Sequence, residues 1–192
     1  QQAWEPISAR VRTLQIRPLP ATLLIISFLI LFTQVFLGAW VSTNYAVLAC
    51  PDFPTCIGSL WPETNWTEGF SLWRQLGLNA QGEFISPIAL QTIHWAHRLF
   101  AVLVLLCLGI LGVRAYQLST AATSTLKRLA VLLLSLLLLQ VLTGISNVIF
   151  QWPLIAALMH TAGSAALVFC LVRMGEWASW SSPVQLKNAK SI

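Results

Sequence analysis

Charged residues are scarce in this sequence. Only 9% of its 192 residues are Asp, Glu, Lys or Arg, whereas 57% are apolar. A soluble globular domain carries about 25% charged residues, so this composition excludes an ordinary soluble domain. The net charge of +5 arises mainly from basic residues that flank apolar stretches, which is a membrane-topology signal. We therefore expect no binding of nucleic acid.

Charge is almost absent from four apolar stretches. Residues 21–41, 129–150 and 153–172 contain no charged side chain, and residues 88–113 contain only Arg98. Each stretch reaches the roughly 20 residues that a helix needs to cross a hydrocarbon core of about 30 Å. The sequence therefore predicts an all-α, polytopic membrane protein, built as an up-down-up-down bundle of four transmembrane helices.

Basic residues are nearly absent from the longest connection, residues 42–87. Arg74 is its one basic residue, whereas four acidic residues lie there: Asp52, Glu63, Glu68 and Glu83. Lys and Arg concentrate instead before the first apolar stretch, around the second connection and after the last stretch. Because cytoplasmic loops carry the excess of Lys and Arg, we predict a cytoplasmic lead (residues 1–20), an exported loop (42–87) and a cytoplasmic tail (173–192).

Cysteine is rare, and two of the four cysteines lie in the predicted exported loop. Cys50 and Cys56 are six residues apart, with Pro51 and Pro54 between them. Two thiols without a nearby histidine do not match a zinc site. An oxidising compartment permits a disulfide that closes a stiff turn. A redox-active pair that hands electrons to a nearby site is the other interpretation, and both stay open.

Aromatic side chains, in contrast, are plentiful in the predicted exported loop, which argues against disorder; they include Phe53, Trp61, Trp66, Phe70, Trp73 and Phe84. Thr67-Glu68, followed by Phe70, Trp73 and Leu76, predicts a short capped amphipathic helix on the membrane interface. These aromatic residues have two interpretations. They form an aromatic belt at the membrane surface, or they form a lid over a cofactor.

The three histidines of the chain, His94, His97 and His160, all lie inside apolar stretches. Ionisable groups at membrane depth are costly and mark functional sites, and imidazole is a common ligand of haem iron. At 1.5 Å per residue, His97 lies about 15 Å from Pro87 and His160 about 10 Å from Pro153, which places both at comparable depth. We predict that His97 and His160 ligate one haem iron from opposite sides. The alternative is that each histidine only bonds to a neighbouring helix.

Two further residues share the helix face of His97. His94 lies three residues before it, and Arg98 lies four residues after His94, so all three face the same way. An unpaired guanidinium at this depth is costly, and we predict that Arg98 binds a haem propionate through a bidentate contact. His94 is a second cofactor-binding candidate, as a propionate partner, a proton shuttle or a replacement ligand.

A short motif occurs twice. The first apolar stretch contains Gln34-Val35-Phe36-Leu37-Gly38, and the third contains Gln140-Val141-Leu142-Thr143-Gly144. Each is followed by a stretch with a histidine near the same end of the predicted helix. A parallel repeat of this kind implies a pseudo-twofold axis along the membrane normal. Such an axis would place His97 and His160 opposite each other, although three matched residues in apolar sequence also arise by chance.

Several motifs together resemble the haem A synthase family, over about residues 34–170. They are Leu37-Gly38-Ala39-Trp40-Val41-Ser42-Thr43-Asn44, Ala49-Cys50-Pro51-Asp52-Phe53-Pro54-Thr55-Cys56, His97-Arg98, and Gln140-Val141 with His160. The resemblance implies an eight-helix protein of two similar four-helix halves in the bacterial inner (cytoplasmic) membrane. That protein oxidises the C8 methyl of haem O to a formyl group and so makes haem A for terminal oxidases. One half binds the substrate haem, and the other holds a b-type haem.

The resemblance also suggests which half this chain is. The family's substrate half carries a glutamate three residues before the His of its His-Arg pair, whereas this chain has His94 there. The chain therefore resembles the carboxyl-terminal, cofactor half, and its start at Gln1 makes us expect a piece of a longer protein. The resemblance then implies that His97 and His160 are the axial ligands of haem b. It also implies a Cys50–Cys56 disulfide and a catalytic site in the other half.

The expected partners are haem O and haem A through the other half, membrane lipid, the terminal oxidase under assembly and a second copy in a homo-oligomer. Two other functions stay open. One is an electron-transfer b-type membrane cytochrome without substrate chemistry. The other is a quinone-linked thiol oxidoreductase, which pairs a four-helix bundle with exported cysteines. Such enzymes need a second thiol pair as a relay, and the exported loop holds only Cys50 and Cys56.

Overall fold

A computed structural model describes residues 19–75, 77–120 and 123–180. Most of the predicted lead and the end of the predicted tail therefore lie outside the described residues. The described residues form five helices and no named strand. The helices are α1 (Ala21–Thr43), α2 (Trp66–Gly69), α3 (Pro87–Leu118), α4 (Ser124–Ile149) and α5 (Leu154–Trp180).

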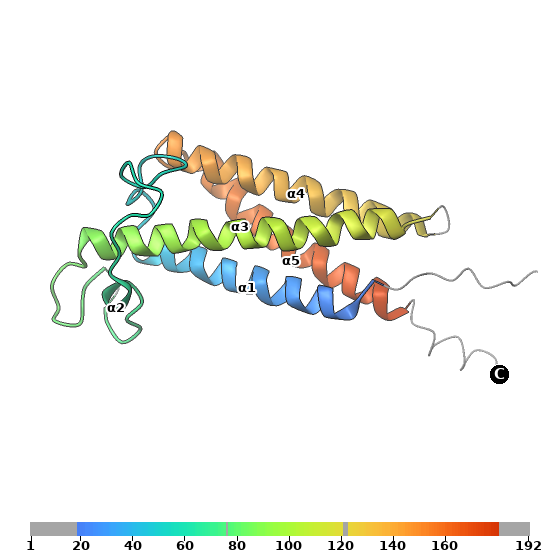
Figure 1. Cartoon of the computed structure of the whole chain (residues 1–192), viewed down its shortest axis with the longest axis horizontal. Helices are drawn as coiled ribbons and strands as arrows, with labels where there is room; N and C mark the ends of the chain where they lie inside the picture. Colours follow the sequence, from blue (N-terminus) through green and yellow to red (C-terminus); the bar gives the residue numbers. More distant parts are fainter. Residues whose placement is uncertain (1–18, 76, 121–122, 181–192) are drawn as a thin grey trace, which may run out of the picture.

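The four long helices are long and apolar enough to cross a membrane. They lie side by side and alternate in direction, so that the long connection and the α4–α5 turn share one end of the bundle (Figure 1). We call this the loop end and the opposite one the terminal end. The predicted all-α, four-helix membrane protein is confirmed. At the terminal end, helices α3, α4 and α5 extend past the apolar stretches into the flanking residues.

The packing of the helices forms a closed ring. Helix α1 packs against α3, α3 against α4, α4 against α5, and α5 against α1. Helices α3 and α5 are therefore diagonal partners, as are α1 and α4. This arrangement matters because α3 carries His94 and His97, whereas α5 carries His160.

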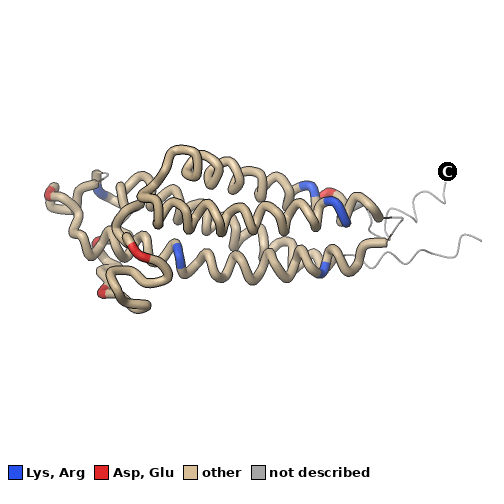
Figure 2. The backbone as a smooth tube through the Cα atoms, turned by 90° about the horizontal axis from the view of Figure 1, so that it is seen from above, with Lys and Arg blue, Asp and Glu red and all other residues tan. Residues whose placement is uncertain are grey.

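The apolar core fills the part of the bundle toward the terminal end. Its fully buried side chains come from all four long helices and include Leu31, Leu108, Leu111, Leu126, Leu133, Leu167 and Met174. Close packing of such side chains supplies the main driving force for association of the helices within the bundle. Acidic residues gather at the loop end, and most basic residues lie toward the terminal end (Figure 2). The three histidines and Arg98 are thus not part of this core.

The beginning of α3 is fixed by its own sequence and by the loop. Ser86 is the N-cap residue and accepts a hydrogen bond from the Ala89 N–H, and Pro87 occupies the first helical position, where its missing N–H costs nothing. Glu68 of the loop accepts hydrogen bonds from both the backbone N–H and the hydroxyl of Ser86. These bonds hold the pKa of the Glu68 carboxyl below its usual value.

A short helix forms where the sequence predicts one, but it is shorter than expected. Helix α2 has four residues, and Asn65 caps it by accepting a hydrogen bond from the Glu68 N–H. It ends at Gly69, where a Cβ would lie only 3.1 Å from the carbonyl oxygen of Ala89 in α3. This close approach holds the end of α2 against α3. The helix stops there, so Phe70 and Trp73 lie outside it. Leu76 lies outside the described residues.

Two glycines of α3 provide a matched test of helix packing. A Cβ at Gly112 would lie 2.8 Å from Leu134 Cδ2 and 2.9 Å from Leu134 Cγ, whereas a Cβ at Gly109 meets nothing within 4 Å. We expect Gly112→Ala to destabilise the bundle by about 1–2 kcal/mol, because overpacking forces a neighbour to move. Gly109→Ala should be neutral or slightly stabilising. Unfolding in mixed detergent, followed by circular dichroism, measures both; equal effects would contradict the close α3–α4 contact.

Candidate functional site

His97 on α3 faces a notch in the neighbouring helix α1. A Cβ at Gly38 would lie 3.1 Å from His97 Cε1, so any larger residue would crowd the ring. The side chain of Gln34, one turn earlier in α1, lies over the same ring. Its Nε2 is 3.2 Å from His97 Nδ1, 3.4 Å from His97 Nε2 and 3.2 Å from the His97 carbonyl oxygen. Helix α1 therefore holds the His97 ring by shape and by hydrogen bonding.

His160 on α5 faces an equivalent notch in α4. A Cβ at Gly144 would lie 3.3 Å from His160 Cε1. The hydroxyl oxygen of Thr143 lies 3.0 Å from His160 Nδ1. The two histidines belong to diagonal helices, and their rings are close enough to interact electrostatically.

The repeated Gln-Val-x-x-Gly motif therefore has a structural meaning. In each unit, the motif's helix presents its glycine to the histidine of the helix that follows in the bundle, Gly38 to His97 and Gly144 to His160. The two halves of the bundle, α1 with α3 and α4 with α5, thus repeat one arrangement. This arrangement accounts for the shared motif residues, which the sequence comparison alone leaves open to chance.

Several buried polar atoms find no hydrogen-bond partner among the described residues. They are Gln34 Oε1, His94 Nδ1, Arg98 Nε, Gln140 Nε2 and Asn147 Oδ1. Buried polar groups are normally paired, so each such atom needs an explanation. Two of them, on Gln34 and Gln140, belong to the repeated motif. Gln140 Nε2 lies against Gly163, one turn after His160, where a Cβ would be only 2.1 Å away.

The prediction that these residues bind a b-type haem has three features of the structure to draw on. Two imidazoles lie on diagonal helices, each ring packs against a glycine, and both glutamines of the repeated motif carry an unpaired buried atom. Iron porphyrins are held by axial histidines, and their polar edges take hydrogen bonds from the protein. Among the described residues there is no group of three or more His, Cys, Asp or Glu side chains that could hold a bare metal ion. Ligation by His97 and His160 stays a prediction.

His94 is more deeply enclosed than the other two histidines, with only 6% of its surface exposed. It interacts electrostatically with Arg98 and His97, and it lies near the backbone of Ala46, which follows α1. The three side chains predicted to share a face therefore do lie close together. The predicted role of His94 toward a cofactor is untested by this geometry.

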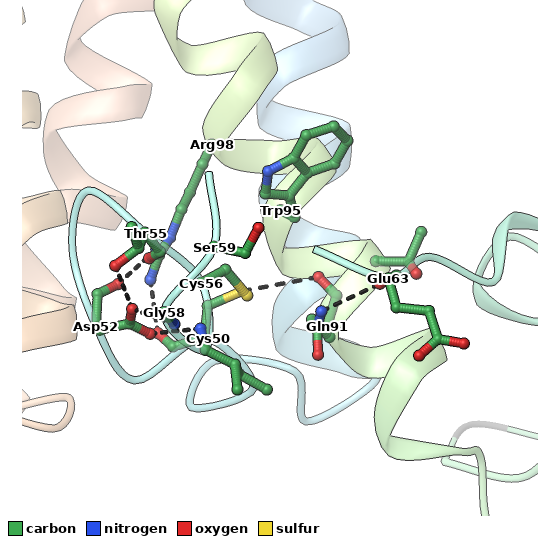
Figure 3. The surroundings of a disulfide bond; sticks show 12 residues. Cys50, Asp52, Thr55, Cys56, Gly58, Ser59, Glu63, Gln91, Trp95 and Arg98 are labelled. Carbon is green, nitrogen blue, oxygen red and sulfur yellow. Dashed lines mark hydrogen bonds between the residues drawn. A yellow bond between two sulfur atoms is a disulfide. The ribbon is translucent and has the colours of Figure 1, made fainter. Parts of the chain in front are cut away.

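Arg98 makes a set of contacts that the sequence reasoning missed. Its terminal nitrogens donate hydrogen bonds to three backbone carbonyls of the loop, those of Cys50 at 2.6 Å, Asp52 at 2.7 Å and Thr55 at 2.9 Å (Figure 3). These bonds satisfy most of the guanidinium, although its Nε stays unpaired. We call this set of contacts the Arg98 clamp. The predicted propionate contact of Arg98 remains a prediction.

A signal for the clamp was present in the sequence. Pro51 and Pro54 lie within the seven-residue segment from Cys50 to Cys56, and proline has no N–H to donate. A tight turn with two prolines is short of internal donors, so its carbonyls need donors from elsewhere. The guanidinium of Arg98 supplies them from helix α3.

Cys50 and Cys56 form a disulfide, with their Cα atoms 4.7 Å apart. Each cysteine has only 1% of its surface exposed, and the pair packs against Trp95 of α3. Within the closed turn, Asp52 accepts hydrogen bonds from the Thr55 hydroxyl and from the N–H groups of Ile57 and Gly58. These bonds, the Thr55 bond first, lower the pKa of Asp52 to about 2.

The rest of the loop is held to α3 through its backbone. Three side chains of the first α3 turns bind loop main-chain groups: Gln91 Nε2 donates to Glu63 O, Thr92 Oγ1 accepts from Asn65 N, and Trp95 Nε1 donates to Leu60 O. The loop is therefore a folded cap over the loop end of the bundle. Trp61 and Trp66 pack edge-to-face on Trp95, whereas Trp73 is 93% exposed. Some aromatic residues of the loop thus pack within the cap, whereas others lie on its outer surface.

The amino-acid sequence matches the COX15-CtaA family, described as cytochrome oxidase assembly protein, over residues 2–172. It is also 38% identical, over 154 residues, to the heme A synthase of Shewanella oneidensis. That alignment covers 79% of this chain and 44% of the relative, so the chain spans less than half of the length of that protein. No solved structure matches the chain.

The Arg98 clamp predicts a specific loss of loop stability. We expect Arg98→Lys to destabilise the protein by about 2 kcal/mol, because lysine keeps the charge but its single ammonium nitrogen cannot take the places of the two guanidinium nitrogens that reach these carbonyls. The matched control is Arg114→Lys, at an exposed position on the same helix. Limited proteolysis of the loop, together with detergent unfolding, measures the effect. A loop that is equally resistant in both variants would show that the clamp is not needed.

Asp52 predicts an acid sensitivity of the disulfide turn. Because folding depresses its pKa from 3.8 to about 2, its contribution to stability is complete above about pH 4 and is lost as the pH falls toward 2. We expect amide protection at Ile57 and Gly58 to decline across this range. Hydrogen exchange measured by mass spectrometry at several acid pH values tests this. Asp52→Asn should show weaker protection with little dependence on pH; an unchanged acid response in that variant would assign the effect to another group.

Proposed function

This chain belongs to the COX15-CtaA family of cytochrome oxidase assembly proteins, and from that premise we propose that it is the haem-binding half of a haem A synthase. The relative of that name shares 38% identity, and the chain corresponds to 44% of its length. The chain has His94 where the family's substrate half carries a glutamate, so we assign it to the carboxyl-terminal, cofactor half. The proposed cofactor is one b-type haem.

One observation carries this proposal. His97 and His160 lie on diagonal helices, and each ring is seated against a glycine of a repeated motif. A structural histidine needs only one interhelical hydrogen bond. Two symmetry-related seats with unpaired polar atoms around them are better explained by a shared ligand between the helices. A porphyrin whose iron takes one imidazole from each of these helices would be such a ligand.

In this proposal the residues have distinct tasks. His97 and His160 would hold the iron, and the haem would supply a one-electron carrier. Gln34 and Thr143 orient the two imidazoles through the hydrogen bonds described above. The folded loop, fastened by Arg98 and the disulfide, covers the site and limits the access of water. His94 is buried beside His97 and serves the polar edge of the cofactor.

The proposed activity of the whole protein needs its other half. There, two successive hydroxylations, each consuming one dioxygen, two electrons and two protons and releasing one water, would convert the C8 methyl of haem O to a hydrated aldehyde, and loss of water would leave the formyl group of haem A. This chain would pass electrons to that site and would not itself contact the reacting methyl. The product serves the assembly of a terminal oxidase, in agreement with the description of the family.

We also propose the orientation in the membrane. Most acidic side chains lie in the long connection, and most basic side chains lie toward the opposite end (Figure 2). The sequence places Arg114 near the end of α3, Lys127 and Arg128 near the start of α4, and Arg173 in the last turns of α5. Arg74, the basic exception in the loop, is bonded to Ser71, Leu78 and Asn44 within the cap. The loop end is therefore exported and the terminal end cytoplasmic, by the positive-inside rule. The membrane is the bacterial inner membrane.

The alternative functions are less well supported. A thiol oxidoreductase needs a disulfide sulfur that an attacking thiolate can reach, whereas Cys50 and Cys56 are 1% exposed each. An electron-transfer cytochrome without substrate chemistry would share the haem site. A product assay for methyl-to-formyl conversion by the complete protein separates that function from the proposed one.

The haem site is tested by spectroscopy on the intact, full-length protein. We expect the purified protein to show the Soret and α bands of a low-spin b-type haem with two imidazole ligands. His97→Ala and His160→Ala should each abolish the low-spin spectrum assigned to this half, because one axial ligand is removed. His94→Gln, one turn from His97, should keep the low-spin spectrum, because His94 is proposed to serve the polar edge of the haem and not to bind the iron. Loss of the low-spin spectrum in His94→Gln with retention in His97→Ala would transfer the ligand role to His94.

A further inference from the structure

The hydrogen bond between Thr143 and His160 fixes the position of a proton. Thr143 Oγ1 lies 2.7 Å from the carbonyl oxygen of Leu139 and 3.0 Å from His160 Nδ1. A threonine hydroxyl has one proton to donate, and a carbonyl oxygen can only accept. The hydroxyl therefore donates to Leu139, and its oxygen accepts a hydrogen bond from the Nδ1–H of His160.

A second acceptor supports the same assignment. The carbonyl oxygen of Gln140 lies 3.3 Å from Thr143 Oγ1, so the hydroxyl proton has a second acceptor within its own helix. Thr143 Oγ1 therefore faces Nδ1 as an acceptor. A neutral imidazole carries one proton, so a protonated Nδ1 leaves the lone pair of Nε2 free. Nε2 with a free lone pair is a nitrogen that can bind a metal.

His97 lacks this arrangement, although it occupies the equivalent place in the repeat. The residue that corresponds to Thr143 in the first motif is Leu37, which offers no acceptor. The partner of the His97 ring is the Gln34 amide nitrogen, 3.2 Å from Nδ1. An amide oxygen in that place would face the His97 carbonyl at 3.2 Å, where two acceptors repel, so the group that faces the ring is the NH₂ donor.

From this difference we propose that Thr143 is a positioning residue that commits His160 Nε2 to the metal, which makes His160 the anchored axial ligand and His97 the weaker one. This inference rests on the proposed haem function. Hydrogen bonds from a ligand imidazole to an outer acceptor fix its tautomer and raise its basicity, and their loss commonly weakens metal binding by 10- to 100-fold. The pseudo-symmetric bundle would then hold its cofactor asymmetrically.

The tautomer is tested without any cofactor. In the haem-free, full-length protein labelled with ¹⁵N-histidine, we expect His160 to carry its proton on Nδ1, as reported by the ¹⁵N chemical shifts of the ring. Thr143→Ser keeps the hydroxyl and should keep this tautomer. Thr143→Val removes it and should give a mixture of the two tautomers. A His160 ring protonated on Nε2 in the unsubstituted protein would overturn the inference, whatever the protein does with haem.

The consequence for ligation is tested in the haem-loaded, full-length protein. We expect Thr143→Val to raise the rate of haem loss from this half about 10-fold and to shift its midpoint potential upward, because a less basic imidazole stabilises the ferric state less. Thr143→Ser should restore both values. The matched control is Thr161→Val, because the Thr161 hydroxyl bonds only to its own helix, at Ala157, and it should change neither value.

A gain-of-contact variant completes the test. Leu37→Thr places a hydroxyl where the first motif has none and should lower the midpoint potential and slow haem loss. If Thr143→Val matches the unsubstituted protein in both values while His160→Ala has lost the low-spin spectrum, the haem function stands and the role of Thr143 fails. If the intact protein binds no haem at this half, the proposed function itself fails.

Discussion

The folded loop depends on one guanidinium inside the membrane bundle. Arg98 would be costly at this depth without partners, and three carbonyls of the Cys50–Cys56 segment supply them. The same bonds satisfy carbonyls that a segment with two prolines cannot pair by itself. Helix α3 and the disulfide turn therefore need each other. Because Arg98 directly follows His97, the loop that covers the site and the histidine within it are fixed by adjacent residues.

The glycines that face the histidines show how a repeated motif builds a site. A Cβ at Gly38 or Gly144 would press on the imidazole opposite, so the two helices of each unit can approach only because these residues are glycine. The glutamine of each motif then brings an amide to the same level of the bundle. The repeat creates two similar seats, and the substitution of Thr143 for Leu37 makes them chemically different.

Much of this could be predicted from the sequence. Long apolar stretches define the four helices because a bilayer requires about 20 such residues, and the depth of His97 and His160 follows from helical rise. The length of α2 could not be predicted, because its end is set by contact between Gly69 and α3. The loop partners of Arg98 could not be identified, since main-chain acceptors 43 to 48 residues away leave no pattern of side chains, and the two prolines indicate only that the turn needs donors from elsewhere. The hydrogen bond between Thr143 and His160 could not be predicted from the repeat, because Thr143 is not one of the residues that the two motifs share.

The placement of the apolar core has a consequence for how the protein folds. The fully buried leucines lie toward the terminal end of the bundle and none of the histidines belongs to that cluster. The terminal end of the bundle is consequently packed without any contribution from the groups around His97 and His160. Under the proposed function, folding of this packed end and delivery of a porphyrin would be separate events, because a newly inserted chain would have its helical framework before the cofactor arrives.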